Sequence, residues 1–192
     1  FNNPRYRHIL FDALCLGTEF DQEVLMANSV TDKAETQKRI NELIDAGILR
    51  RGDLDRLIFD HYIYDVFIKH ADIDNIRRGR LKLARLMEQF YKKEDGTIEA
   101  DHINELAKIF FDALNLNISW EKQKQSLGIV EHDLISTTNL LEQSAKRYEG
   151  IMRLHEAVES YNDYVAIMTY MRAHGLAASL DDDKLASAYK NL

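Results

Sequence analysis

His61 is the residue whose type and position offer the most specific chemistry in this sequence. It follows Asp60 at the predicted start of a helix over residues 61–69. The first N–H groups of a helix and its dipole favour an anion, and an imidazole beside them can donate a hydrogen bond to a phosphate oxygen. The alternative is a structural histidine that hydrogen-bonds to Asp60 or to the backbone. Both interpretations stay open on the sequence alone.

Four cations form a second candidate site, which would contact the phosphates of a nucleic acid. Lys38 and Arg39 lie on a predicted helix, and Arg50 and Arg51 follow on a predicted hairpin. A DNA-binding winged helix places such residues at the groove. Acidic residues are interleaved with them, however, and this mixture disfavours binding to a duplex. These acids are Glu35, Glu42, Asp45, Asp53 and Asp55.

A second basic stretch covers residues 77–93, in which Glu88 is the only acid. Its seven lysines and arginines could meet phosphates of DNA or of a nucleotide. The alternative is a solvated helix face, or one paired with an acidic neighbouring domain. We favour this second interpretation.

Several kinds of catalytic site are missing from the sequence. No Gly-x-x-x-x-Gly-Lys run is present, so the chain itself offers no phosphate-binding loop for nucleotide hydrolysis. His155-Glu156 is not followed by a second histidine at zinc-protease spacing. Cys15 lies on the apolar face of a predicted helix and is expected to be a buried structural thiol. We therefore expect no enzyme, no metal site and no cofactor in this chain.

The composition is that of a globular protein. Hydrophobic residues make up 45% and charged residues 30% of the 192 residues, and the formal net charge is -7. This negative charge gives no reason to expect a nucleic-acid partner, and no run reaches the roughly 20 apolar residues of a membrane helix. A single cysteine fits a reducing compartment, so we expect a cytoplasmic protein without a membrane partner. The chain starts at Phe1 and ends in mid-pattern at Leu192, which leads us to expect a piece of a larger protein.

The first half of the chain predicts three helices followed by a hairpin. Apolar residues recur at helical spacing over residues 5–16, Asp21 caps a short helix at 22–28, and Thr31 or Asp32 caps a third that stops at Gly47. Two apolar runs around a Gly/Asp tip then predict a hairpin near residues 48–59. This order is the winged-helix arrangement, which we assign to residues 1–70.

The second half predicts helices throughout. One proline in the whole chain, Pro4, leaves long helices uninterrupted. We expect helices at about 61–69, 75–93, 100–116, 121–127, 131–147, 149–172 and 183–192. Residues 71–118 are assigned to a helical arm and residues 119–192 to antiparallel helical hairpins. The predicted fold class is mostly α, with over 60% helix and a short β-hairpin.

Five segments resemble, in order and spacing, the region after the ATPase core of bacterial signal-transducing NTPases with numerous domains. That family includes the large activators of the maltose-regulator and LuxR type. The first segment carries Leu16-Gly17 followed by Glu19-Phe20-Asp21, and Phe59-Asp60-His61 resembles a phenylalanine-x-histidine signature after the wing. The other segments are residues 40–49, 80–88 and 105–110. The resemblance covers residues 5–114 and departs from the family at Arg80, where a histidine is usual.

The resemblance implies a regulatory role. It implies that His61 contacts a phosphate of ADP in a parent ATPase that binds ATP or ADP, and so holds the off state. Residues 166–176 and 181–192 resemble parts of tetratricopeptide repeats, which stack helix pairs on one another. The expected function is a non-catalytic scaffold that relays nucleotide state, with an upstream ATPase domain, further helical repeats and a protein bound by those repeats as partners. The alternative is a DNA-binding winged-helix transcriptional regulator.

Overall fold

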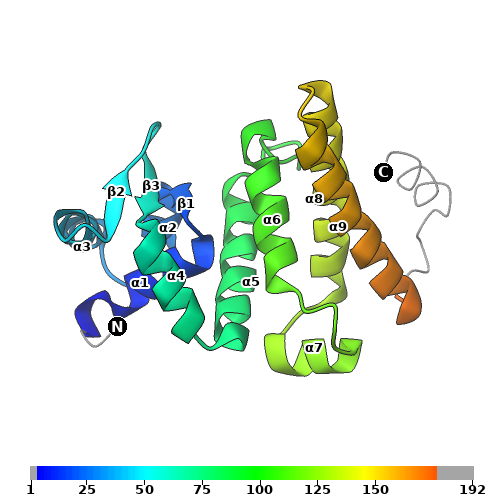
Figure 1. Ribbon diagram of the computed structural model, residues 1–192, viewed down its shortest axis with the longest axis horizontal. Helices are drawn as coiled ribbons and strands as arrows, with labels where there is room; N and C mark the ends of the chain where they lie inside the picture. Colours follow the sequence, from blue (N-terminus) through cyan, green and yellow to red (C-terminus); the bar gives the residue numbers. More distant parts are fainter. Residues whose placement is uncertain (1–3, 177–192) are drawn as a thin grey trace. The chain divides into compact units, whose positions relative to one another are not determined.

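The computed structural model describes residues 4–176, and the chain divides into two compact units, residues 1–90 and 91–192. Helices make up 71% of the described residues, which confirms the prediction of a mostly helical fold (Figure 1). The predicted helix at 183–192 and the second tetratricopeptide-like segment lie outside the described residues. None of the helices described is both long and apolar enough to cross a membrane.

Unit 1 mixes helices with a small sheet. Its elements in chain order are α1 (Pro4–Leu16), β1 (Glu19–Asp21), α2 (Gln22–Asn28), α3 (Lys33–Asp45), β2 (Leu49–Arg51), β3 (Arg56–Phe59), α4 (His61–His70) and α5 (Ile73–Phe90). The helix starts follow the predicted caps, because a short acidic side chain can accept from the free N–H groups of the first turn. Asp21 accepts from the backbone N–H of Glu23, and Asp32 accepts from that of Glu35.

The sheet has three antiparallel strands in the order β1-β3-β2. The sequence predicts the β2–β3 hairpin but not β1. Three residues are too few to show an alternating pattern, and β1 is fixed by its pairing with β3, in which Phe20 lies opposite Leu57. The order of pairing places β3 in the centre, so both edges of this strand are occupied.

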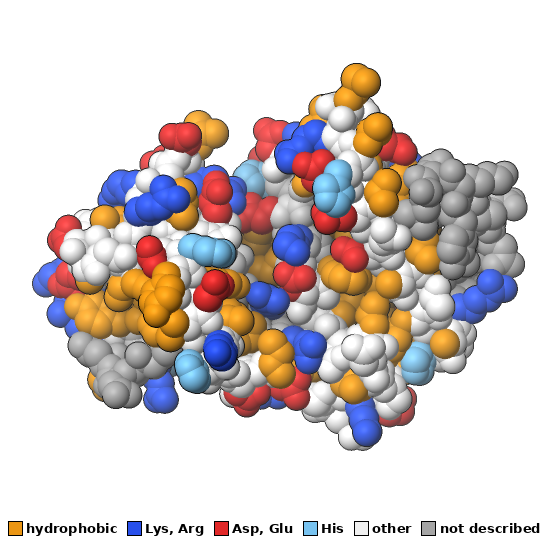
Figure 2. Space-filling view, in the orientation of Figure 1, with side chains coloured by type: hydrophobic (Ala, Val, Ile, Leu, Met, Phe, Trp, Pro, Cys, Tyr) orange, Lys and Arg blue, Asp and Glu red, His pale blue; other side chains and the backbone are white. Residues whose placement is uncertain are grey.

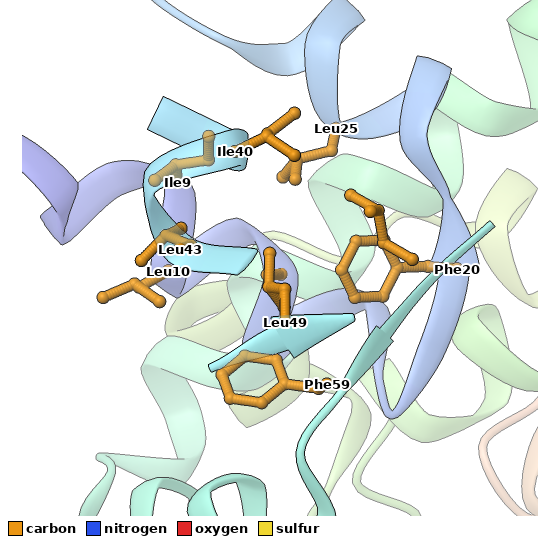
Figure 3. Close-up of a cluster of buried hydrophobic side chains, with 10 residues drawn as sticks. Ile9, Leu10, Phe20, Leu25, Ile40, Leu43, Leu49 and Phe59 are labelled. Atoms are coloured by element: carbon orange, nitrogen blue, oxygen red, sulfur yellow. The ribbon is translucent and has the colours of Figure 1, made fainter. Parts of the chain in front are cut away.

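The core of unit 1 lies where the sheet meets α1, α2 and α3. Figure 3 shows side chains from all of these elements converging on one cluster. Its buried members are Ile9, Leu10, Ala13, Phe20, Leu25, Ile40, Leu43, Leu49, Leu57 and Phe59. Burial of such side chains contributes roughly 1.5–3 kcal/mol each, which makes this cluster the main source of stability in unit 1.

The described part of unit 2 is helical apart from an isolated antiparallel bridge between Lys92 and Ile98. Its elements are a 3-10 turn (Ala100–His102), α6 (Ile103–Ala113), α7 (Trp120–Leu127), α8 (Glu131–Gly150) and α9 (Leu154–Ala173). Helix α8 packs along α9, and α6 packs on α8 (Figure 1). At the start of α8, Asp133 Oδ2 accepts from the backbone N–H of Val130 at 2.7 Å.

Two features of the organisation differ from the sequence prediction. Helix α9 begins at Leu154 rather than near residue 149, because α8 continues to Gly150 and Met152 then adopts a left-handed backbone (φ 59°). The unit boundary lies after Phe90, whereas the predicted segments end at residues 70 and 118. Helix α5 packs on α1 and α2 and therefore belongs to unit 1, and α6 packs on α8 and therefore belongs to unit 2.

Candidate functional site

The two predicted cations of α3 differ in their surroundings. Lys38 is exposed. Arg39 is committed within the unit: its Nε pairs with Glu35 Oε1 at 3.0 Å, and its Nη1 donates to the backbone oxygen of Arg5 at 2.9 Å. The Arg39 guanidinium also lowers the pKa of the Glu35 carboxyl, chiefly by hydrogen bonding. One of these two cations is thus neutralised locally.

The two predicted cations of the hairpin are both exposed. Arg50 is exposed on β2, where it lies opposite Ile58. Arg51 donates to Asn41 Oδ1 at 3.0 Å and to Gln22 Oε1 at 3.4 Å. On the face drawn in Figure 2, acidic and basic side chains are interspersed rather than segregated. Such a mixture weakens the attraction to a phosphate backbone, which depends on a concentrated positive field.

The tip of the β2–β3 hairpin carries a feature that the sequence did not reveal. Leu54 and Asp55 both have a left-handed backbone, with φ of 53° and 60°, and the Arg56 N–H donates to the Asp53 oxygen at 3.1 Å. Two-residue turns of this kind prefer asparagine and glycine. The Leu54 side chain is 94% exposed. An apolar residue is therefore held in strained backbone without any packing to stabilise it.

His61 is the first residue of α4, at the predicted position. Asp60 caps the helix by accepting from the Ile63 N–H at 3.0 Å, so the alternative of a hydrogen bond from His61 to Asp60 is not the one formed. The His61 side chain is 83% exposed, and its Nε2 lies 3.7 Å from Asp65 Oδ2. An anion approaching His61 would therefore meet carboxylates at Asp60 and Asp65 as well as the imidazole.

Helix α4 presents an unusual apolar face. None of its residues is buried. Ile63, Tyr64 and Phe67 pack on the core cluster from one side, while Tyr62 is 78% exposed on the other. Figure 2 shows hydrophobic side chains gathered at the surface over α4. This face adjoins the position of His61 along the same helix.

A cavity of about 410 Å³ lies between α1, α4 and the start of α5. Its lining is mostly apolar. The lining residues are Arg7, Phe11, Leu14, Val66, Phe67, His70, Ala71, Asp72 and Asn75. His61 and the four candidate cations of α3 and β2 line neither this cavity nor the one described below in unit 2.

Comparison with known proteins adds no family to this geometry. The chain matches no protein-family model, no curated protein and no solved structure.

The remaining reactive group of unit 1 is placed where it cannot act as a nucleophile at neutral pH. Cys15 is buried, and its Sγ donates to the backbone oxygen of Ile76 at 3.7 Å. Burial raises the pKa of this thiol to about 12, so the thiolate is scarce. Among residues 4–176, no three His, Cys, Asp or Glu side chains are arranged to hold a metal ion.

Proposed function

We propose that the chain is a non-catalytic regulatory module whose unit 1 is a winged-helix domain and whose unit 2 is a helical scaffold of tetratricopeptide-like hairpins. The observation that carries the proposal is the element order of unit 1, three helices with β1 between the first two, followed by the β2–β3 hairpin. Winged-helix domains share this order. The pairing of α8 with α9 supports the second part, because helical repeats are built from such antiparallel pairs.

The module acts by protein contact. Its partner is an ATPase domain of the same parent protein. This domain contacts the exposed face of α4 at His61 and Tyr62. The nucleotide state passes through this contact to further helical repeats and to the protein that those repeats bind. The apolar exposure of α4 supports this assignment, since exposed apolar surface of this kind marks interaction sites. ATP or ADP is bound by the parent, and this chain contributes at most the imidazole of His61.

The DNA-binding alternative has less support, because Arg39 is ion-paired with Glu35 and acidic residues are interleaved with the exposed cations. Retention of the purified chain on a duplex DNA column at low salt separates the two functions. We expect no retention. Retention that falls steeply with added salt, and is weakened by Lys38→Ala and Arg50→Ala together, would favour the transcriptional regulator instead.

The regulatory role is tested with His61→Ala in the parent protein. A hydrogen bond to a charged phosphate contributes roughly 1.5–3 kcal/mol, so its loss is expected to raise the ADP dissociation constant about tenfold to a hundredfold. His155→Ala is the matched control: His155 is 82% exposed, and its Nε2 lies 3.8 Å from Glu159, four residues further along its helix. Unchanged ADP affinity in His61→Ala, with a lowered melting temperature, would reduce His61 to a structural residue.

A further inference from the structure

Unit 2 contains a second cavity, of about 140 Å³, which is partly open to solvent and lined by α6, α8 and α9. A single water needs only about 10–15 Å³ of this kind of volume, so the cavity can admit a small organic molecule. Its lining is mainly polar and comes from all three helices. The lining residues are Asn104, Ala107, Lys108, Leu141, Ser144, Tyr148, Glu156, Glu159, Ser160 and Asp163.

The charges around this cavity are predominantly negative. Glu156, Glu159 and Asp163 recur at i, i+3 and i+7 along α9, which places them on one face of that helix. Lys108 is the single cation of the lining, and its Nζ lies 3.6 Å from the carboxylate of Asp112 on its own helix. Arg153 pairs with Glu156, and His155 Nε2 lies 3.8 Å from Glu159, so Asp163 is the acid of this lining without an ion pair.

Of the three acids, Asp163 lies where its charged form is least stabilised. The residues described in the structure give it neither an ion pair nor a hydrogen bond. Burial raises its pKa to about 6, and the nearby acids Asp112 and Glu159 act in the same direction, against the lowering effect of Lys108. Lys108 is ion-paired with Asp112 and not with Asp163, and a partly buried carboxylate without an ion pair costs free energy that a bound cation would remove.

The opposite wall of the cavity contains a buried hydrogen-bond acceptor that also lacks a partner. Asn104 Oδ1 on α6 is buried and has no hydrogen-bond partner. The hydroxyls of Ser144 and Ser160, 3.2 Å apart, lie buried between α8 and α9 at the same cavity. Unsatisfied buried acceptors are rare in folded proteins, and an N–H donor inside the cavity would satisfy this one.

We propose that unit 2 binds a small organic cation, an ammonium or guanidinium group with N–H donors, in the cavity between α6, α8 and α9. The cation pairs with Asp163 and Glu159 and donates a hydrogen bond to Asn104 Oδ1. No three acidic or histidine side chains among residues 4–176 converge as metal ligands, and acceptors spread over two walls fit a multi-atom cation better than a single ion. This site does not depend on the winged-helix proposal for unit 1.

Calorimetric titration of the full chain with methylguanidinium tests the proposal. We expect saturable binding at constant ionic strength, and binding at least tenfold weaker with tetramethylammonium, which has the same charge but no N–H donor. Asp163→Asn, which preserves the shape of the side chain, should raise the dissociation constant about tenfold to a hundredfold. The control Glu131→Gln removes an exposed acid at the start of α8, away from the cavity lining, and should leave affinity unchanged.

The pH dependence gives an independent readout. With the pKa of Asp163 at about 6, the carboxylate forms as the pH rises from 5 to 7, so affinity should increase over this range in the native chain. The groups around it are Lys108 and Asp112 on α6, Tyr148 on α8 and Glu156 and Glu159 on α9. Asp163→Asn should flatten the rise, with circular dichroism showing an intact fold.

The source of the cation is distinguished by a second ligand. A short Gly-Arg-Gly peptide that binds more tightly than methylguanidinium would assign the site to an arginine of a protein partner. Binding of methylguanidinium alone would assign it to a free small molecule. Equal affinity of the native chain and Asp163→Asn for methylguanidinium, or no saturation at millimolar concentrations, would overturn the proposal.

Discussion

The interior of unit 1 is almost entirely apolar, whereas the interior of unit 2 contains a series of hydroxyl, amide and carboxyl groups. Of the buried polar side chains described, Thr36 alone belongs to unit 1. Those of unit 2 are Gln123, Asp133, Ser136, Thr137, Thr138, Ser144 and Ser160. The contrast indicates that unit 1 depends on complementary volumes, while the pairing of α8 and α9 also depends on matched hydrogen bonds, which fix one alignment of the helices.

The largest expected effect is the removal of an aromatic side chain from the core cluster of unit 1. Phe59 is 1% exposed, and its ring makes edge contacts with Tyr64 and Phe67 at centroid distances of 5.6 and 6.0 Å. Phe59→Ala should lower the free energy of unfolding by about 3–5 kcal/mol in urea denaturation. Leu54→Ala, at the exposed hairpin tip, is the control and should change it by less than about 0.5 kcal/mol. A loss below about 1 kcal/mol for Phe59→Ala would contradict a tightly packed core.

A pair of glycines tests how closely each unit is packed. A Cβ added at Gly79 in α5 would lie 2.4 Å from Cys15 Sγ and 2.9 Å from Phe11 Cε1, whereas one added at Gly150 in α8 meets nothing within 4 Å. Alanine in a helix gains about 1 kcal/mol over glycine, but overpacking costs about 1–3 kcal/mol. Gly79→Ala should therefore lower the free energy of unfolding by up to about 2 kcal/mol, and Gly150→Ala should raise it.

The cause of the Gly79 effect can be isolated by a second substitution. Cys15→Ala removes the sulfur that the new Cβ would strike, so the double variant Cys15→Ala/Gly79→Ala should be more stable than the sum of the single changes predicts. Strict additivity in the thermal unfolding of the four proteins would rule out a steric conflict between these two positions.

Local signals explain why most elements could be predicted from the sequence. Asp21, Asp32 and Gly47 mark helix ends through interactions within a few residues, and these signals are readable without the fold. Strand β1 could not be read, because its three residues are extended through pairing with β3. The turn at Met152 could not be read either, since methionine does not favour the left-handed backbone that it adopts there.

One candidate site could be predicted from the sequence, and the other could not. The position of His61 at a helix start follows from Asp60 as a cap and was predictable. The cavity of unit 2 was not, because it brings together Asn104, Ser144 and Asp163 from three helices whose spatial neighbours a single sequence does not reveal. The acids of α9 show a spacing of three and four residues that could have drawn attention to this face, although such spacing alone is typical of solvated helices.

The buried hydroxyl pair of unit 2 provides a test of the polar interior. Ser144→Ala or Ser160→Ala leaves one buried hydroxyl without its partner, at a cost of about 1–2 kcal/mol, whereas replacing both serines should be nearly neutral. A double-mutant cycle on the urea unfolding of unit 2 measures this coupling. The expected result is a double variant more stable than either single variant. Single variants as stable as the native chain would show that the pair does not contribute to the alignment of α8 and α9.

The smallest effects are expected at the two turns where the units resemble each other. Leu54 in unit 1 and Met152 in unit 2 both hold a left-handed backbone, with φ of 53° and 59°, and their side chains are 94% and 84% exposed. Asparagine tolerates this conformation better than leucine or methionine, and neither exposed side chain contributes packing. Leu54→Asn and Met152→Asn should therefore each raise the free energy of unfolding by about 0.5–1 kcal/mol, measured by urea denaturation. Equal increases in the free energy of unfolding would show that relief of the backbone strain does not depend on the core beneath each turn. The two units would then differ only in their interiors. A loss at either position would instead mean that the apolar side chain contacts the folded unit.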